Sequence, residues 1–368
     1  MNEPIASNEK TNPLILVTGA AGKTGNATVR ALLEQEGVRV RALVRREDDR
    51  ARAMRKAGAD VVVGNMDDIR DMRQAMRDVQ RAYFVAPLSN CTLDQAMNFA
   101  IAAEEAKLEH VVAMSQWLTS ASHPSEFTRR HWLLERMIEW MPTVGHTFIN
   151  VGWFADNYMA ILGLIANFGI FPLAIQGKTA PVDHEDIGRV VAAVLVNPAP
   201  YANRTLRPTG PELMTPQQIA DTFGKVLGRK VRHVFSKERF LSKSLKARGE
   251  KAFAHAQVLN YVREYHRGTM EFGAPNDVVQ EVTGRPAADF ETIVRRYVAS
   301  DPMAQQSLGN KLKVMQVLMR AVVTSPMDVE RWRIEQDMPR IAHPEDCIDS
   351  TDWKSTHAAR NAYGVNTG

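Results

Sequence analysis

The sequence is poor in the residues that build disulfide scaffolds and structural metal sites. Only two cysteines, Cys91 and Cys347, occur among 368 residues, and neither belongs to a Cys-x-x-Cys pair. No cysteine and histidine cluster has zinc-finger spacing, so we expect neither a disulfide framework nor a bound metal. So few cysteines fit a reducing, cytoplasmic location.

The sequence also lacks a clear membrane-spanning segment, and beyond its first residues it lacks the composition of a disordered chain. Residues 1–13 are polar and have no apolar centre typical of a signal peptide, so we expect a disordered tail. The longest apolar segment, 158–175, is near the lower length limit of a membrane span and contains Asn167 and Pro172. We therefore predict a buried helix or pocket wall there, and no membrane association.

Extreme charge is absent as well, since the net charge is +4 and charged residues make up 24%. Positive charge is concentrated in residues 225–251, which hold ten Lys or Arg against two Asp or Glu. This segment is either a solvated face or a region that attracts an anionic cofactor or substrate. Because it carries no nucleic-acid motif or aromatic platform, nucleic-acid binding is not expected.

Short apolar runs alternate with amphipathic segments between residues 14 and 151. The expected strands are 14–17, 38–44, 60–63, 81–86, 110–115 and 146–151. Helical crossovers between strands require parallel pairing, so the pattern predicts an α/β doubly wound sheet of the Rossmann type. We expect a dinucleotide-binding core over 14–152, a smaller α+β substrate region over 153–300 and a helical C-terminal extension over 301–368.

The extension carries one pronounced apolar stripe. Its residues recur at helical spacing and are Leu312, Met315, Leu318, Met319, Val322 and Val323. Exposure of such a stripe to water is unfavourable. We therefore expect the helix to bury it, either against the substrate region or in a homodimer contact.

A glycine-rich turn follows the first expected strand. In the segment TGAAGKTG at 18–25, Gly19 permits a tight turn, Gly22 permits close approach of a pyrophosphate, and Gly25 permits helix packing on the sheet. The N–H groups at the start of the next helix, around Lys23 and Thr24, then face the phosphates. This spacing after a strand predicts dinucleotide binding.

The ends of the following strands indicate which dinucleotide binds. The second strand ends without the acid that binds the ribose of NAD, and Arg45 there can pair with a 2′-phosphate. The sequence therefore favours NADP(H), the alternative being that Arg45 is merely solvated. We place Asn65 and Asp67 beside the adenine, and Ala86 and Pro87 beside the ribose and nicotinamide.

Several segments together resemble the NmrA-like branch of the atypical short-chain dehydrogenase/reductase superfamily. They are TGAAGKTG at 18–25, LVRR at 43–46, NVGWFADN at 150–157 and PVDHEDIGRVVAAVL at 181–195. The resemblance covers roughly residues 14–298. It implies an NADP(H)-dependent oxidoreductase similar to quinone oxidoreductase-like and triphenylmethane-reductase-like members.

The Tyr-x-x-x-Lys pair of the classical superfamily members is missing, because no tyrosine has a lysine four residues later. The matching helix instead holds His131 and Glu135, one turn apart on the same face. We expect His131 to polarise or protonate the substrate near neutral pH, with Glu135 holding its charge. Ser115, at the end of the fifth strand, is a further candidate catalytic residue. The alternative for all three is a structural role.

Aromatic residues follow the strand ends where a substrate would lie. Trp117, Trp153, Phe154 and Tyr158 are the candidate substrate-binding residues, the alternative being core packing. Such a lining suits a quinone, an aromatic carbonyl or an enone. The function expected is an NADPH-dependent oxidoreductase acting on a small aromatic or unsaturated compound. The alternative is a non-catalytic protein that senses NADP(H) and regulates a partner.

Overall fold

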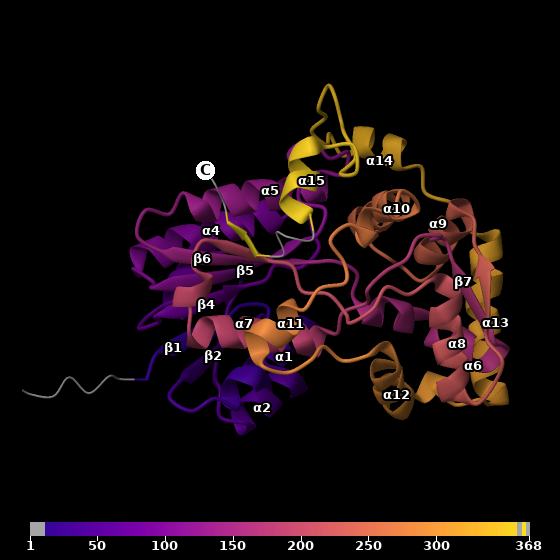
Figure 1. Cartoon of the computed structure of the whole chain (residues 1–368), viewed down its shortest axis with the longest axis horizontal. Coiled ribbons are helices and arrows are strands. Elements are labelled where there is room, and N and C mark those ends of the chain that lie inside the picture. The colour runs from indigo at the N-terminus through magenta and orange to yellow at the C-terminus, as the bar shows by residue number, and fades with distance from the viewer. Residues whose placement is uncertain (1–11, 359–362, 366–368) are drawn as a thin grey trace, which may run out of the picture.

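The computed structural model describes residues 12–358 and 363–365. The predicted disordered tail, 1–13, falls outside the described residues except for Asn12 and Pro13. An eight-stranded sheet forms one half of the molecule, and a helical region with a small second sheet forms the other (Figure 1).

The order of strands in the large sheet is β10-β8-β6-β5-β4-β1-β2-β3. The bounds are β1 Leu14–Val17, β2 Arg39–Val44, β3 Asp60–Val63, β4 Arg81–Phe84, β5 His110–Gln116, β6 Gly145–Val151, β8 Arg204–Leu206 and β10 Tyr363–Val365. Neighbouring strands pair in parallel, except that β10 is antiparallel to β8. The order reverses at β1, and this confirms the predicted doubly wound Rossmann sheet.

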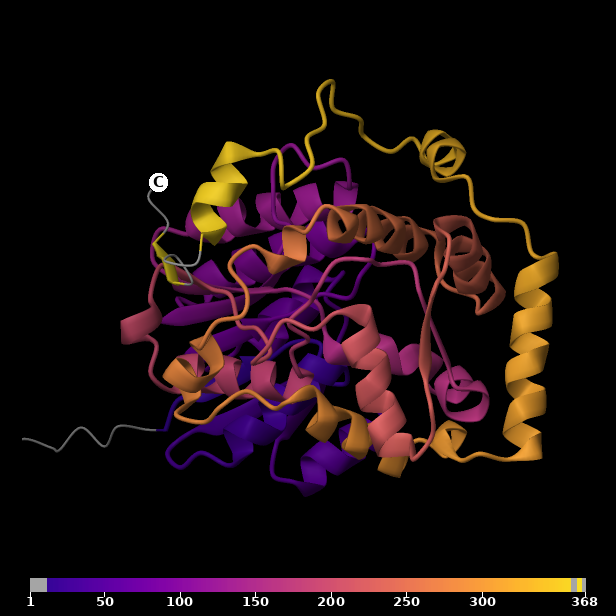
Figure 2. The ribbon, with the colours of Figure 1, turned by 45° about the vertical axis from the view of Figure 1, so that its right-hand side comes forward.

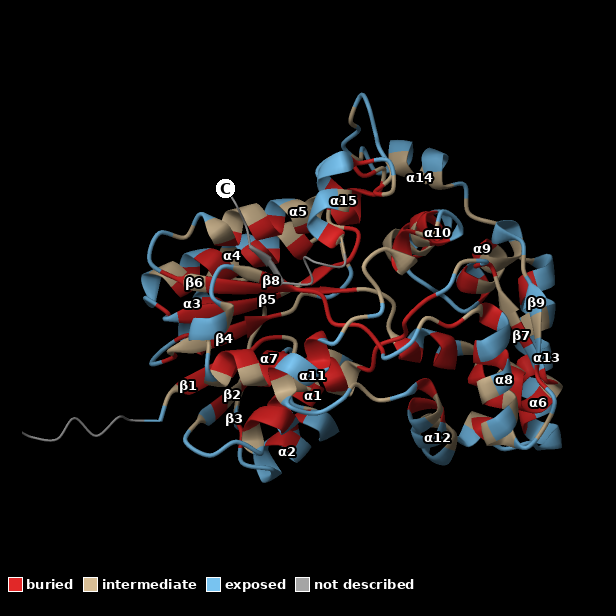
Figure 3. Cartoon of the chain, viewed as in Figure 1, coloured by how far each residue is buried: buried red, intermediate tan, exposed pale blue. Residues whose placement is uncertain are grey.

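Helices cover both faces of this sheet. One group contains α1 Lys23–Leu33, α2 Asp49–Lys56, α7 His184–Val196 and α11 Val278–Thr283. The other contains α3 Ile69–Ala75, α4 Thr92–Glu105 and α5 Glu126–Glu139. A hydrophobic core lies on each face of the sheet, and alternate residues of β1 point into one or the other. Ile15 packs with Val29 and Ile187, and Leu16 packs with Phe99 and Leu134 on the opposite face. The central strands are therefore buried on both sides, whereas the edge strand β3 is partly exposed (Figure 3).

The second half of the molecule is built around a two-stranded parallel sheet of β7 Ile170–Leu173 and β9 Arg232–Phe235. Its helices are η1 Ala155–Ile161, α6 Leu162–Phe168, α8 Pro216–Leu227, α9 Glu238–Ala247, α10 Ala252–His266 and α12 Phe290–Ser300. The apolar segment 158–175 forms parts of η1, α6 and β7. Among the described residues, no helix combines the length and apolar character needed to cross a membrane.

The C-terminal extension wraps around the outside of the molecule. Its helices are α13 Leu308–Val323, α14 Val329–Glu335 and α15 Thr351–His357. Figure 2 shows α13 at the outer edge of the second half, and the chain then crosses back to the large sheet. This path places the start and the end of the extension on different halves of the molecule.

The face by which α13 docks differs from the expected one. Val314 and Ala321 are buried, whereas most of the predicted stripe is exposed: Leu312, Met315, Met319, Val322 and Val323. This inner face packs against α6, where a Cβ at Gly163 would lie 3.4 Å from Val314 Cγ2. The prediction that the stripe is buried is thus wrong for the isolated chain, and a homodimer through it stays a prediction.

The last part of the extension packs into the core between the two halves. The Cys347 backbone N–H donates to Glu264 Oε1 over 2.8 Å, and the same carboxylate oxygen lies 2.9 Å from His123 Nε2. The Trp353 indole Nε1–H donates to the Trp117 carbonyl oxygen over 3.0 Å. Burial raises the pKa of the Cys347 thiol, which therefore stays neutral. Both cysteines are free.

Candidate functional site

The glycine turn between β1 and α1 has the shape of a phosphate cradle. Gly19 has a φ of +55°, and a Cβ at Gly25 would lie 2.3 Å from the Gly19 carbonyl oxygen. Other residues therefore cannot replace these glycines without a backbone shift. Gly22 caps α1 without a side-chain hydrogen bond, and the first turn of α1 holds no acid. The free N–H groups there suit an anionic group such as a pyrophosphate.

Lys23 and Thr24, at the start of α1, both line the large cavity described below. The Lys23 ammonium pairs with the carboxylate of Asp156, a buried residue of η1. The pair joins the glycine turn to the second half of the molecule. Sequence reasoning missed Asp156, because nothing in the NVGWFADN segment indicates a contact with residue 23.

The polar residues expected around an adenosine meet at the end of β2. The Arg45 guanidinium is 69% exposed and lies 3.6 Å from a carboxylate oxygen of Asp67. The Asn65 side-chain oxygen accepts from the Asp67 backbone N–H over 3.2 Å. Arg50 of α2, which the sequence did not single out, donates to the Ala21 carbonyl oxygen over 3.0 Å. Arg50 therefore contacts the glycine turn, and Arg45 lies just after the end of β2.

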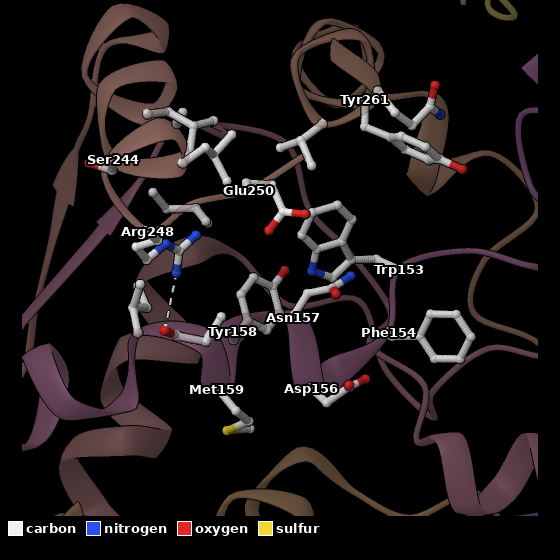
Figure 4. Close-up of a pocket in the computed structure, with 18 of the residues that line it drawn as sticks. Trp153, Phe154, Asp156, Asn157, Tyr158, Met159, Ser244, Arg248, Glu250 and Tyr261 are labelled. Carbon is white, nitrogen blue, oxygen red and sulfur yellow. Dashed lines mark hydrogen bonds between the residues drawn. The ribbon is translucent and has the colours of Figure 1, made fainter. Parts of the chain in front are cut away.

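A cavity of about 940 Å³ extends from the glycine turn into the second half of the molecule. The predicted residues that line it are Lys23, Thr24, Ala86, Ser115, His131, Trp153, Phe154 and Tyr158. Figure 4 shows Trp153, Tyr158 and Tyr261 around its middle part. The structure thus brings predicted cofactor, catalytic and substrate residues to one space.

Two predicted residues lie elsewhere. Trp117 is buried in the core beneath the cavity, and its indole N–H donates to the Thr269 carbonyl oxygen over 3.2 Å. It follows the last residue of β5 and does not line the cavity, because its side chain packs against α10 and the extension. Pro87 is exposed, and its carbonyl oxygen accepts from the Thr92 hydroxyl over 3.2 Å. Its neighbour Ala86 is the one that lines the cavity.

Ser115 and Glu135 form a buried pair beside the cavity. The Ser115 hydroxyl, at the end of β5, lies 3.1 Å from the Thr119 hydroxyl, and it is close enough to the Glu135 carboxyl of α5 to affect its pKa. The Glu135 Oε1 atom is buried and has no hydrogen-bond partner. Burial raises the pKa of Glu135 from 4.5 to about 7, although the Ser115 hydroxyl and the charges of Arg136 and Arg207 oppose this shift. A carboxyl with such a pKa exchanges its proton near neutral pH, as a proton donor must.

His131 is a neutral hydrogen-bond acceptor in this site. Its Nδ1 lies 3.0 Å from the Phe127 carbonyl oxygen, so Nδ1 carries the proton and Nε2 presents a lone pair. Burial lowers the pKa of His131 to about 4. Burial thus favours the neutral forms of both groups, which argues against a charged His131 held by Glu135.

Two further polar groups of the cavity wall have free hydrogen-bonding capacity. The Trp153 indole Nε1 and the Gln257 amide Nε2 are buried atoms without a hydrogen-bond partner, and both residues line the cavity. The Tyr261 hydroxyl, in contrast, donates to the Gln116 side-chain oxygen. A mostly apolar cavity with a few N–H donors suits an aromatic molecule that carries acceptor oxygens or nitrogens.

Comparison with known proteins identifies the family. The model of the NmrA-like family matches residues 11–285. The NAD(P)H azoreductase of Xenophilus azovorans is 26% identical, over 78% of this chain and 99% of that protein. The Escherichia coli NADPH-dependent quinone oxidoreductase complexed with NADPH aligns with a TM-score of 0.67 at 20% identity, over 77% of this chain and 99% of that one.

A further solved structure has the same fold, namely the Citrobacter triphenylmethane reductase complexed with NADP(H). Its TM-score is 0.66 at 20% identity, over 77% of this chain and 99% of that one. The family model spans the whole glycine turn, the Ser115–Glu135 pair and most of the cavity. The chain is therefore a member of the NmrA-like family.

Proposed function

We propose that the protein is an NADPH-dependent oxidoreductase that reduces a small aromatic or unsaturated compound, such as a quinone, an aromatic carbonyl or an enone. The observation that carries this proposal is the single cavity that joins the glycine turn to a wall of aromatic and aliphatic side chains. Relatives named as an azoreductase and a quinone oxidoreductase support it. Cytoplasmic location stays a prediction.

The residues of the glycine turn fit a dinucleotide. Gly22, Lys23 and the first N–H groups of α1 would hold the pyrophosphate, and Arg45 with Arg50 would meet a 2′-phosphate. When bound, reduced NADP supplies the hydride for the substrate. The Lys23 ammonium would then divide its interaction between Asp156 and the phosphates.

A proton must accompany the hydride, and the Ser115–Glu135 pair can deliver it. The neutral Glu135 carboxyl donates its proton to the Ser115 oxygen, which frees the Ser115 hydroxyl proton for a substrate oxygen in the cavity. An ionised Glu135 carboxylate instead accepts a hydrogen bond from the Ser115 hydroxyl, so that this proton is not available to the substrate. His131 Nε2, a lone-pair acceptor, orients a substrate or cofactor N–H or O–H group. Ser115 and Glu135 thus take the role of the missing Tyr-x-x-x-Lys pair.

Turnover with a compound panel tests the proposed reaction. Consumption of NADPH is followed with benzoquinones, naphthoquinones, aromatic aldehydes, enones and an azo dye, with NADH as the comparison. We expect turnover with at least one aromatic class and a preference for NADPH. Tight NADPH binding without turnover across the panel would instead favour the regulatory, NADP(H)-sensing alternative.

The choice of cofactor is tested at Arg45. The Arg45→Ala variant removes a charged contact to the 2′-phosphate and is expected to weaken NADPH binding by about 1.5–3 kcal/mol while leaving NADH binding unchanged. Arg46→Ala is the matched control, because Arg46 is 78% exposed and pairs with Asp48. Both dissociation constants are measured by fluorescence titration. Equal losses for the two cofactors would remove Arg45 from the phosphate site.

A further inference from the structure

The cavity does not end where a one-ring substrate would lie beside the glycine turn. Its outer end continues between α9 and α13, where the lining residues are Leu241, Leu245, Val314, Val317, Leu318 and Ala321. We call this part the outer chamber. Most of its lining is aliphatic, although Ser244 of α9, Arg248 at the end of α9 and Lys313 of α13 also line the cavity (Figure 4). The whole cavity is at the upper end of the roughly 300–1,000 Å³ typical of small-molecule sites.

The α13 wall of the outer chamber is held firmly in place. A Cβ at Gly163 would lie 3.0 Å from Met303 Cε and 3.4 Å from Val314 Cγ2, so the extension is in close contact with α6. The Lys243 ammonium of α9 donates to the Val322 carbonyl oxygen at the end of α13 over 2.9 Å. Asn167 of α6 donates to the Met303 carbonyl oxygen over 3.1 Å. Contacts on two sides therefore fix the helix that closes the cavity.

This wall is supplied by a part of the chain outside the shared family region. The family model ends at residue 285, before α13 begins at Leu308. The aligned solved structures are matched over 99% of their length by 77% of this chain. The outer chamber is therefore completed by residues particular to this longer chain.

We propose that the outer chamber is a second substrate subsite, formed by α9 and α13, which takes the apolar extension of an elongated substrate. The extension is a second ring or an alkyl chain attached to the ring that is reduced. This proposal rests on the proposed function, since the reduced ring lies beside Ser115. Aliphatic side chains recognise such a group by burying its apolar surface, and Val317 and Leu318 set the space available.

The test narrows the chamber from α13 and compares two substrates. The Val317→Trp variant narrows the mouth of the chamber, where Val317 lines the cavity and is 43% exposed. Met319→Trp places the same side chain on the face of the same helix that does not line the cavity. The substrates are two benzoquinones that differ only in a methyl or a decyl substituent. We expect Val317→Trp to raise KM for the decyl compound about tenfold or more, with the methyl compound within twofold of the parent protein. Met319→Trp should leave both values unchanged.

Calorimetric binding of the decyl quinone to the protein loaded with NADP+ separates this proposal from the proposed reaction. The subsite stands if Val317→Trp weakens this binding about tenfold, even where no quinone is reduced. It is overturned if binding and both KM values are unaffected. If Val317→Trp does not fold, the same measurements are made on Ser244→Phe, which narrows the chamber from α9. The same loss of decyl selectivity is expected for it, and unaltered selectivity again overturns the subsite.

Discussion

Replacing Ser115 with alanine is expected to lower kcat for NADPH-dependent reduction about 100-fold, because the substrate then loses its proton donor. NADPH binding should be unchanged, since the phosphate cradle is formed by other residues. Glu135→Gln is expected to lower kcat about tenfold, because the amide can orient the Ser115 hydroxyl but cannot replace its proton. The measurement is steady-state turnover from pH 5 to 9 with the best substrate of the panel.

The pH profile distinguishes the proton relay from a structural role. The active form has a protonated Glu135, whose pKa burial raises to about 7. Activity of the parent protein should therefore be full below pH 7 and fall as the pH rises through that value. Glu135→Gln should abolish this fall, whereas His131→Ala should retain it. A Ser115→Ala variant with more than a third of the parent kcat would contradict the relay.

Replacing Trp353 with alanine is expected to lower the free energy of unfolding by about 3–5 kcal/mol. This side chain is 3% exposed, stacks on His357 and hydrogen-bonds the Trp117 carbonyl oxygen. Its loss leaves a cavity and an unpaired carbonyl group in the core between the two halves. Urea denaturation followed by circular dichroism measures the change.

Trp140→Ala provides the matched control for this prediction. Trp140 lies at the end of α5 and is 81% exposed, so its removal should change the free energy of unfolding by less than about 0.5 kcal/mol. A loss below about 1 kcal/mol for Trp353→Ala would show that the end of the extension contributes little. A much larger loss of unfolding free energy for Trp353→Ala than for Trp140→Ala would show that residues 347–357 belong to the folded core.

The sequence predicted the large sheet closely because its signals are local. Each strand is a short apolar run, and each crossover begins with a recognisable turn or cap, such as Asp48 before α2. The prediction was poorer in the second half. There, the largely helical segment 238–266 is divided into α9 and α10, and the chain adopts a φ of +80° at Gly249 between them. That glycine is the local signal that could have revealed the break.

By itself, the sequence determined the Rossmann sheet, the glycine turn at residues 18–25 and the positions of Ser115, His131 and Glu135. The sheet and the turn follow from periodicity and spacing within single segments, whereas His131 and Glu135 were singled out by the resemblance to the NmrA-like family. Only the tertiary structure decided that Glu135 is buried near Ser115, while His131 is hydrogen-bonded to the backbone of its own helix. Protonation depends on burial, and burial is produced by segments far apart in the chain. The face of α13 that packs inward was likewise evident only in the tertiary structure, because it packs against Gly163 of α6, about 150 residues away in the chain.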